Sequence, residues 1–118
     1  MEKEKYLEKA VAWAERKPTI SLKATIEGYE DPKTYKSKST DEVVQADLSF
    51  ITNGGAKHYT EVALKKDNPK DLVVKWKVLS FMASMKRGKL HLLAPKGHKA
   101  FTLKLVRRHN INAVVHPI

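Results

Sequence analysis

The sequence predicts a single α/β (α+β) domain, residues 1–118, in which one mixed β-sheet is flanked by helices. Three observations lead to this fold class. Apolar residues recur every three to four positions at the start of the chain, as on the buried face of a helix. Three segments then alternate apolar and polar residues, as half-buried strands do. Two strand–helix alternations follow, so the predicted order is α-β-β-β-α-β-α-β.

The first helix is predicted at residues 2–16 and ends before Pro18, because proline disfavours helical geometry in the residue before it. The alternation at residues 20–26 predicts the first strand, which ends at Gly28. Residues 33–40 are polar and have no period, so this segment is interpreted as a mobile connection.

The second and third strands are predicted at residues 42–51 and 58–65, on either side of the sequence Asn53-Gly54-Gly55. Asparagine and glycine adopt positive φ at low cost and are typical of tight turns. The two strands are therefore expected to form an antiparallel hairpin.

Helices and strands alternate in the rest of the chain. A helix is predicted from about Asp71, and Gly88 is expected to terminate it. Residues 90–94 (LHLLA) are almost continuously apolar, as in a strand covered on both faces. A last helix is expected from about Lys99 and a last strand around residues 113–115.

Composition excludes several classes of protein. The chain has no cysteine, so disulfides and thiolate metal sites are excluded. Its N-terminus is charged from the second residue and lacks the apolar stretch of a signal peptide. No apolar run approaches the roughly 18 residues of a membrane span. The expected location is the cytoplasm.

The net charge of +10 is unevenly distributed along the chain. Residues 1–56 carry 9 Lys/Arg and 10 Asp/Glu, whereas residues 57–118 carry 14 and 3. This excess of positive charge favours a polyanionic partner, with nucleic acid the first expectation and an anionic membrane surface the second. The alternative is that the lysines only keep a small domain in solution.

Two acidic residues, Asp47 and Glu61, are placed to form a metal site. Each lies mid-strand on the polar face of its predicted strand, about seven residues from Gly54, so the hairpin makes them cross-strand neighbours. Two carboxylates side by side repel each other unless a cation lies between them, and oxygen ligands suit Mg²⁺ or Mn²⁺. The alternative is two exposed acids that are each paired with a lysine.

Three lysines are candidates to act near these carboxylates. Lys65 shares the face of Glu61 by the two-residue period, and Lys75 and Lys77 lie in the first turns of the following helix. A lysine beside a metal-bound water and a phosphate orients the nucleophile or neutralises developing charge. The alternative for all three is a solvated surface position.

The order of elements, with VVQADLSF (43–50), HYTEVALKK (58–66) and DLVVKWKVLSFM (71–82), resembles the PD-(D/E)XK (restriction-endonuclease-like) nuclease superfamily. The resemblance implies that Asp47 is the metal-binding aspartate, that Glu61 is the acid of the E-x-K element, and that the carbonyl of Val62 is a further metal ligand. The family places its lysine where this chain has Ala63. Lys65 or Lys75 is expected to substitute for it.

The resemblance also leaves room for a third acidic ligand, for which Glu8 and Glu30 are the candidates. Beyond the site, the remaining basic residues are candidates for phosphate contacts. They are Lys77, Lys86, Arg87, Lys89, Lys96, Lys99, Lys104, Arg107 and Arg108.

The histidines and tryptophans are given structural or surface roles. His91, His98 and His109 have no zinc-site spacing and are expected on the surface or facing phosphates. Trp13 and Trp76 fall on apolar helical faces and are expected in the core.

The leading functional hypothesis is a deoxyribonuclease that uses Mg²⁺ or Mn²⁺ to hydrolyse phosphodiester bonds. The first alternative is a non-catalytic nucleic-acid-binding domain that keeps the fold but has lost the lysine. The second is a protein-interaction domain. A homodimer or a partner subunit is compatible with each of these.

Overall fold

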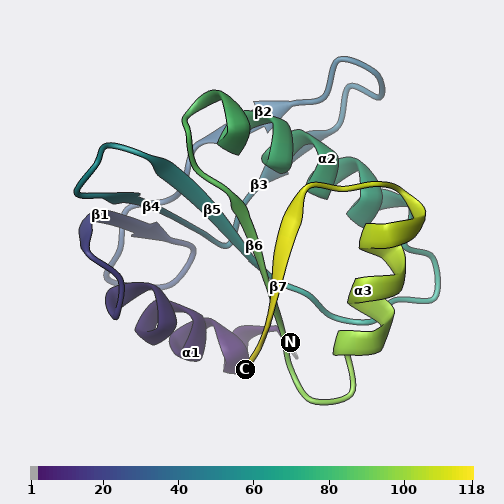
Figure 1. Ribbon diagram of the computed structural model, residues 1–118, viewed down its shortest axis with the longest axis horizontal. Coiled ribbons are helices and arrows are strands. Elements are labelled where there is room, and N and C mark those ends of the chain that lie inside the picture. The colour runs from purple at the N-terminus through teal and green to yellow at the C-terminus, as the bar shows by residue number, and fades with distance from the viewer. Residues whose placement is uncertain (1–2) are drawn as a thin grey trace.

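The computed structural model describes residues 3–118 and has three helices, with a five-stranded mixed sheet and a separate two-stranded sheet (Figure 1). The helices are α1 (Glu4–Glu15), α2 (Lys70–Met85) and α3 (Lys99–Arg108). The strands are β1 (Thr19–Ala24), β2 (Thr34–Lys36), β3 (Val43–Gln45), β4 (Leu48–Thr52), β5 (Lys57–Val62), β6 (Leu90–Ala94) and β7 (Ala113–Pro117).

The large sheet has the strand order β1-β4-β5-β6-β7. The pairs β1–β4 and β4–β5 are antiparallel. A short turn connects β4 to β5, whereas the long segment that contains β2 and β3 connects β1 to β4. The pairs β5–β6 and β6–β7 are parallel, since α2 and α3 provide the crossovers. The mixed α/β class and the placement of helices on both faces are confirmed.

The helix α1 covers one face of the sheet. Its buried residues Leu7, Ala10, Val11 and Ala14 pack against side chains of β1, β4, β5 and β6. The largest of these partners, Phe50, is 1% exposed. The three-to-four spacing that predicted this helix is therefore the spacing of its contacts with the sheet.

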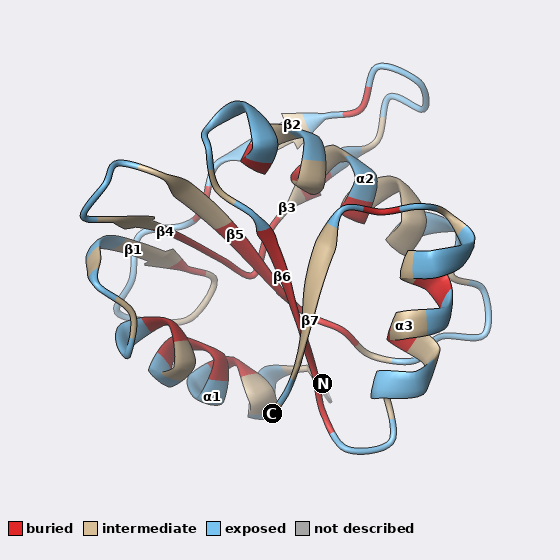
Figure 2. Cartoon of the chain, viewed as in Figure 1, coloured by how far each residue is buried: buried red, intermediate tan, exposed pale blue. Residues whose placement is uncertain are grey.

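The helices α2 and α3 cover the other face (Figure 2). Trp76, Leu79 and Leu105 contribute to a core that also contains Tyr59 of β5. Trp76 is fully buried, as predicted, whereas Trp13 is only half-buried. All five residues of β6 are buried, so the prediction of a strand covered on both faces is confirmed.

The prediction of a single sheet is wrong, because β2 and β3 pair with each other outside the five-stranded sheet. The segment 33–40, expected to be a mobile connection, contains β2. Its anchor is Tyr35, whose hydroxyl is hydrogen-bonded to that of Tyr59. The strand expected at residues 42–51 is accordingly divided into β3 and β4.

The end of α2 differs in detail from the prediction. Gly88 N–H donates to the carbonyl of Ala83 (2.9 Å), but the residue with positive φ is Arg87 (61°). Glycine is required at position 88 for another reason. A Cβ there would lie 1.8 Å from the carbonyl oxygen of Lys57, so β5 passes too close for any side chain.

Among residues 3–118, no helix has the length and apolar character needed to cross a membrane.

Candidate functional site

The site forms where β4 begins and β5 ends. Asp47 directly precedes β4, and the register that sets Leu48 opposite Thr60 also sets Asp47 opposite Glu61. Asp47 therefore lies at a strand terminus, rather than mid-strand as expected. Its Oδ2 accepts a hydrogen bond from the N–H of Val62 (2.8 Å), which fixes the carboxylate against the end of β5.

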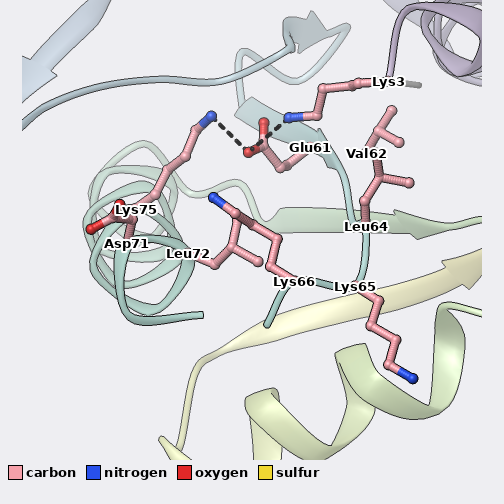
Figure 3. Close-up of a pocket in the computed structure, with 9 residues that line it drawn as sticks. All are labelled: Lys3, Glu61, Val62, Leu64, Lys65, Lys66, Asp71, Leu72 and Lys75. Atoms are coloured by element: carbon pink, nitrogen blue, oxygen red, sulfur yellow. Dashed lines mark ion pairs between the residues drawn. The ribbon is translucent and has the colours of Figure 1, made fainter. Parts of the chain in front are cut away.

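Two lysines contact the carboxylates, and Lys3 contacts both of them. Lys3 Nζ lies 3.1 Å from Asp47 Oδ2 and 3.4 Å from Glu61 Oε2. The two oxygens are therefore no more than about 6.5 Å apart. Lys75 Nζ of α2 lies 2.7 Å from the same Glu61 Oε2 (Figure 3).

Glu61 is fully buried, and this sets its electrostatics. Burial, followed by the negative charge of Asp47, raises the pKa of Glu61 to about 7, against the opposing charges of Lys3 and Lys75. Burial would lower the pKa of Lys3, but the charges of Glu61 and Asp47 outweigh it and raise that pKa. The site thus favours a protonated Lys3 beside the two carboxylates and makes it easier to protonate Glu61.

Glu61 opens into a cavity of about 520 Å³ whose wall contains four lysines. These are Lys3, Lys65, Lys66 and Lys75. The acidic residues of the wall are Glu61 and Asp71. Because positive side chains outnumber negative ones, the cavity is suited to an anion such as a phosphate group.

Lys65 and Lys75, the two lysines expected to replace the family's lysine, differ in whether they contact Glu61. Lys75 contacts Glu61, whereas the side chain of Lys65 points away from that ion pair (Figure 3). The strand ends at Val62, so the two-residue period that placed Lys65 on the face of Glu61 does not extend to it. The main-chain N–H of Lys65 instead donates to His98 Nδ1 (2.8 Å). Ala63 is fully buried.

The carboxylates fit a hard divalent cation. Both ion pairs of Glu61 reach Oε2, whereas Oε1 has neither an ion pair nor a hydrogen-bond partner in the described part of the chain. An oxygen buried without a partner is costly, and a divalent ion would satisfy it. Asp47 and Glu61 would supply the side-chain ligands, and the carbonyl of Val62 follows directly in the chain.

A third carboxylate is not found beside this pair. No group of three or more His, Asp or Glu side chains that could hold a metal occurs among residues 3–118. Of the two candidates, Glu8 is exposed on α1, and Glu30 pairs with Lys23 (3.8 Å). Neither lines the cavity. Solvent or substrate oxygens would have to complete the coordination of an ion here.

The basic residues predicted to contact phosphates are spread over the surface. Lys96 and Lys99 follow β6, whose end lies beside the end of β5. Arg108 lines a second hollow beside α3, which Arg107 does not line. Lys77 lines a different hollow between β2 and α2.

Lys86 and Arg87 follow the C-terminal end of α2, away from the cavity that its N-terminal half lines. Arg87 Nη2 donates a hydrogen bond to the carbonyl of Gly54 (3.3 Å). The predicted phosphate contacts therefore do not form one surface.

The expectation of a surface position is wrong for His91. It is 9% exposed and bonded on both sides, to His58 (3.1 Å) and to His116 (3.0 Å). Burial, and then the charges of His116 and His58, lower the pKa of His91 to about 3. These histidines come from adjacent strands, β5, β6 and β7, whose pairing the sequence spacing did not show.

Lys3 and Lys66 are site residues that the sequence reading did not single out. Lys3 is spaced four residues before Leu7 and eight before Val11, so it continues the buried face of α1 towards the sheet. That spacing is a signal that could have identified it. Lys66 extends from the β5–α2 connection towards Glu61 (Figure 3), and no pattern marked it.

Comparison of the chain with models of protein families, with curated proteins and with solved structures finds no match.

Proposed function

We propose that the protein is a metal-dependent phosphodiesterase that acts on DNA. The observation that carries the proposal is Glu61, a fully buried carboxylate in the wall of a cavity bordered by four lysines. Asp47 lies beside it, and Lys3 contacts both carboxylates. Carboxylates of this kind bind hard cations, and lysines bind phosphate. The site therefore has ligands for a metal ion and positive side chains for a phosphate group, and metal-dependent phosphodiester hydrolysis requires both.

The restriction-endonuclease-like fold is part of this proposal. The sheet order β1-β4-β5-β6-β7 with crossovers by α2 and α3 supports it, as does the position of the acids on β5 and just before β4. The chain differs from that family at Ala63. Here α2 delivers an ammonium group to Glu61 through Lys75, so the missing lysine of β5 is replaced from the facing helix.

Each side chain has a defined role. Asp47 and Glu61 hold the cation, and Val62 N–H keeps Asp47 in position. A bound divalent ion supplies positive charge at the phosphate and lowers the pKa of bound water. Lys75 neutralises charge that develops on the phosphate oxygens, and Lys66 holds the phosphate group at the cavity mouth.

A non-catalytic nucleic-acid-binding domain is the second candidate. The observation that favours it is Lys3 Nζ, which contacts both carboxylates and so provides a resident positive charge. In this case the ion pairs stabilise the fold, and the lysines of the cavity bind DNA without cleaving it.

A cleavage assay tests the proposal. Supercoiled, linear and branched DNA are incubated with Mg²⁺ or Mn²⁺ and the wild-type protein, with Asp47→Asn, or with Asp71→Asn. Asp71 is the matched control, since it lines the same cavity without contacting Glu61 in the described structure. We expect cleavage that a chelator abolishes, that Asp47→Asn loses and that Asp71→Asn retains. Salt-sensitive DNA binding without cleavage by the wild type would favour the second candidate.

A further inference from the structure

A second hollow adjoins the carboxylate cavity. It has a volume of about 240 Å³ and lies between the β5–α2 connection and one face of α3. Lys66 lines both the cavity and the hollow, so the two are neighbours on the surface. A polymeric ligand that lies at Glu61 can thus extend along α3 without crossing the sheet.

Cations dominate this hollow. Its basic residues are Lys66, Lys104 and Arg108, and its only acidic residue among those described is Asp67. None of the three cations forms an ion pair within the described residues. Their charges remain available to an external anion, and a row of such charges matches the phosphates of a nucleic-acid backbone.

An aromatic ring accompanies the cations. Phe101 lines the hollow and is half-buried, with its inner side against the core under α3. Phe101, Lys104 and Arg108 are spaced three and four residues apart, so they share one face of the helix. An aromatic ring beside a positive track is the arrangement that binds unpaired bases by stacking.

We propose that this hollow binds a single-stranded flank of the DNA whose backbone lies at the carboxylate pair. Lys66, Lys104 and Arg108 hold its phosphates, and Phe101 stacks on one base. A duplex keeps its bases inside the helix, so only an unpaired segment can present a base to the ring. The proposal rests on the proposed function for the identity of the polymer and for its position at Asp47 and Glu61.

The test measures binding without metal by fluorescence anisotropy, in a chelator, with a labelled 20-nucleotide single strand and its duplex. The wild type is compared with Lys104→Glu/Arg108→Glu and with Lys86→Glu/Arg107→Glu. Both double variants change the net charge equally, but Lys86 and Arg107 do not line the hollow. If the protein attracts polyanions only through its net charge, both double variants lose the same amount of affinity for DNA.

We expect the variant in the hollow to bind single-stranded DNA at least about tenfold more weakly than its control at low salt. The slope of log affinity against log salt falls by about 1.4, or about 0.7 for each lost phosphate contact on a single strand. Equal losses in the two double variants would overturn the proposal.

The variant Phe101→Leu tests the stacking contact while keeping an apolar side chain against the core. We expect single-strand affinity to fall about fivefold or more and duplex affinity to remain unchanged. An equal change for single strand and duplex, with an unaltered unfolding midpoint, would contradict a stacking role.

This inference and the proposed nuclease activity fail separately. The wild type could fail to cleave DNA while the variants in the hollow still lose single-strand affinity selectively. The proposed nuclease activity would then be wrong, and the proposed binding site would stand. If cleavage depends on Asp47 but neither cleavage nor binding depends on Lys104, Arg108 or Phe101, the nuclease stands and the binding site is wrong.

Discussion

Glu61 has the highest electrostatic cost of the described residues at the site. A charge in so buried a position loses several kcal/mol of hydration, which the fold recovers only through well-placed partners. Lys75 and Lys3 are those partners, at 2.7 and 3.4 Å from Oε2. Oε1 has neither a hydrogen bond nor an ion pair with a described residue. A residue kept at such a cost is the expected signature of a functional site.

The lysine that contacts Glu61 is predicted to matter, and the lysine that points away is not. Because removing one electrostatic stabiliser of a transition state typically costs at least about 100-fold in rate, we expect Lys75→Met to reduce metal-dependent DNA cleavage by about that factor. Lys65→Met, the matched control, should leave cleavage nearly unchanged. Initial rates of nicking provide the measurement, and equal losses in the two variants would assign no special role to Lys75.

The two acids and one of their cations, Lys75, are predicted from the sequence, whereas Lys3 is not. The pairing of Asp47 with Glu61 follows from the symmetry of the hairpin around the glycine turn. Lys3 lies just before α1, far from both acids in the sequence, and only its spacing along the buried face of α1 marks it. The period that favoured Lys65 failed because β5 ends three residues before it.

Three strands are linked by a chain of neutral histidines. Lys89 N–H donates to His58 Nδ1, so that nitrogen accepts, and His91 Nε2–H must donate to it. His91 Nδ1 then accepts from His116 Nε2–H. A second proton on His91 would face an N–H of His116 unless His116 changed its tautomer to accept at Nε2.

Trp13 and Phe50 cover the central ring of this chain, with centroids 5.1 and 6.0 Å from that of His91. The charged groups that face the histidines are Lys17 and Lys89, which lower the pKa of His58 after burial itself. Burial and the two lysines all disfavour the protonation of His58.

Stability is predicted to fall in acid because of these histidines. The pKa of His91 is lowered to about 3, so its contribution is complete above pH 6.5 and is lost as the pH falls towards 3. Between pH 7.5 and pH 5 we expect a loss of roughly 2 kcal/mol from His91.

Urea unfolding at the two pH values measures this loss, and His91→Gln should show it reduced by about that amount. His109→Gln, outside the chain of rings, is the control and should behave as wild type. An identical acid response of His91→Gln and wild type would contradict the prediction.

Gly88 fixes the distance between α2 and β5. Its missing side chain allows the carbonyl of Lys57 to approach, so we expect Gly88→Ala to lower the free energy of unfolding by about 3 kcal/mol. Gly54→Ala is the control, since no atom lies within 4 Å of the Cβ it would add. Chemical denaturation compares the two, and equal stability would show that β5 can move aside.

The helices and the strands of the large sheet could be predicted because their periods are long or unbroken. The short strand β2 could not, since three residues are too few to show a period, and nothing marked the break between β3 and β4 within the strand predicted at 42–51. Tyr35 is the single apolar anchor of β2, and its partner Tyr59 is 24 residues away. A contact between residues so far apart in the sequence leaves no local pattern from which β2 could be predicted.

The uneven charge of the chain has a counterpart in the folded molecule. The basic half, residues 57–118, builds α2, α3 and the connection between β5 and α2, which together border the cavity and the adjoining hollow. The first half contributes Asp47, directly before β4, and Lys3, before α1. Positive charge thus surrounds a pair of acids, an arrangement that suits a metal and a phosphate together.

Binding of Mn²⁺ measured by calorimetry tests the carboxylate pair most directly. We expect the wild type to bind the ion saturably, Asp47→Asn and Glu61→Gln to lose that binding, and Asp71→Asn to retain it. Lys3→Met should strengthen binding, because the ammonium group that competes for both carboxylates is gone. No saturable binding by the wild type, or equal binding by wild type and Asp47→Asn, would contradict a metal site at Asp47 and Glu61.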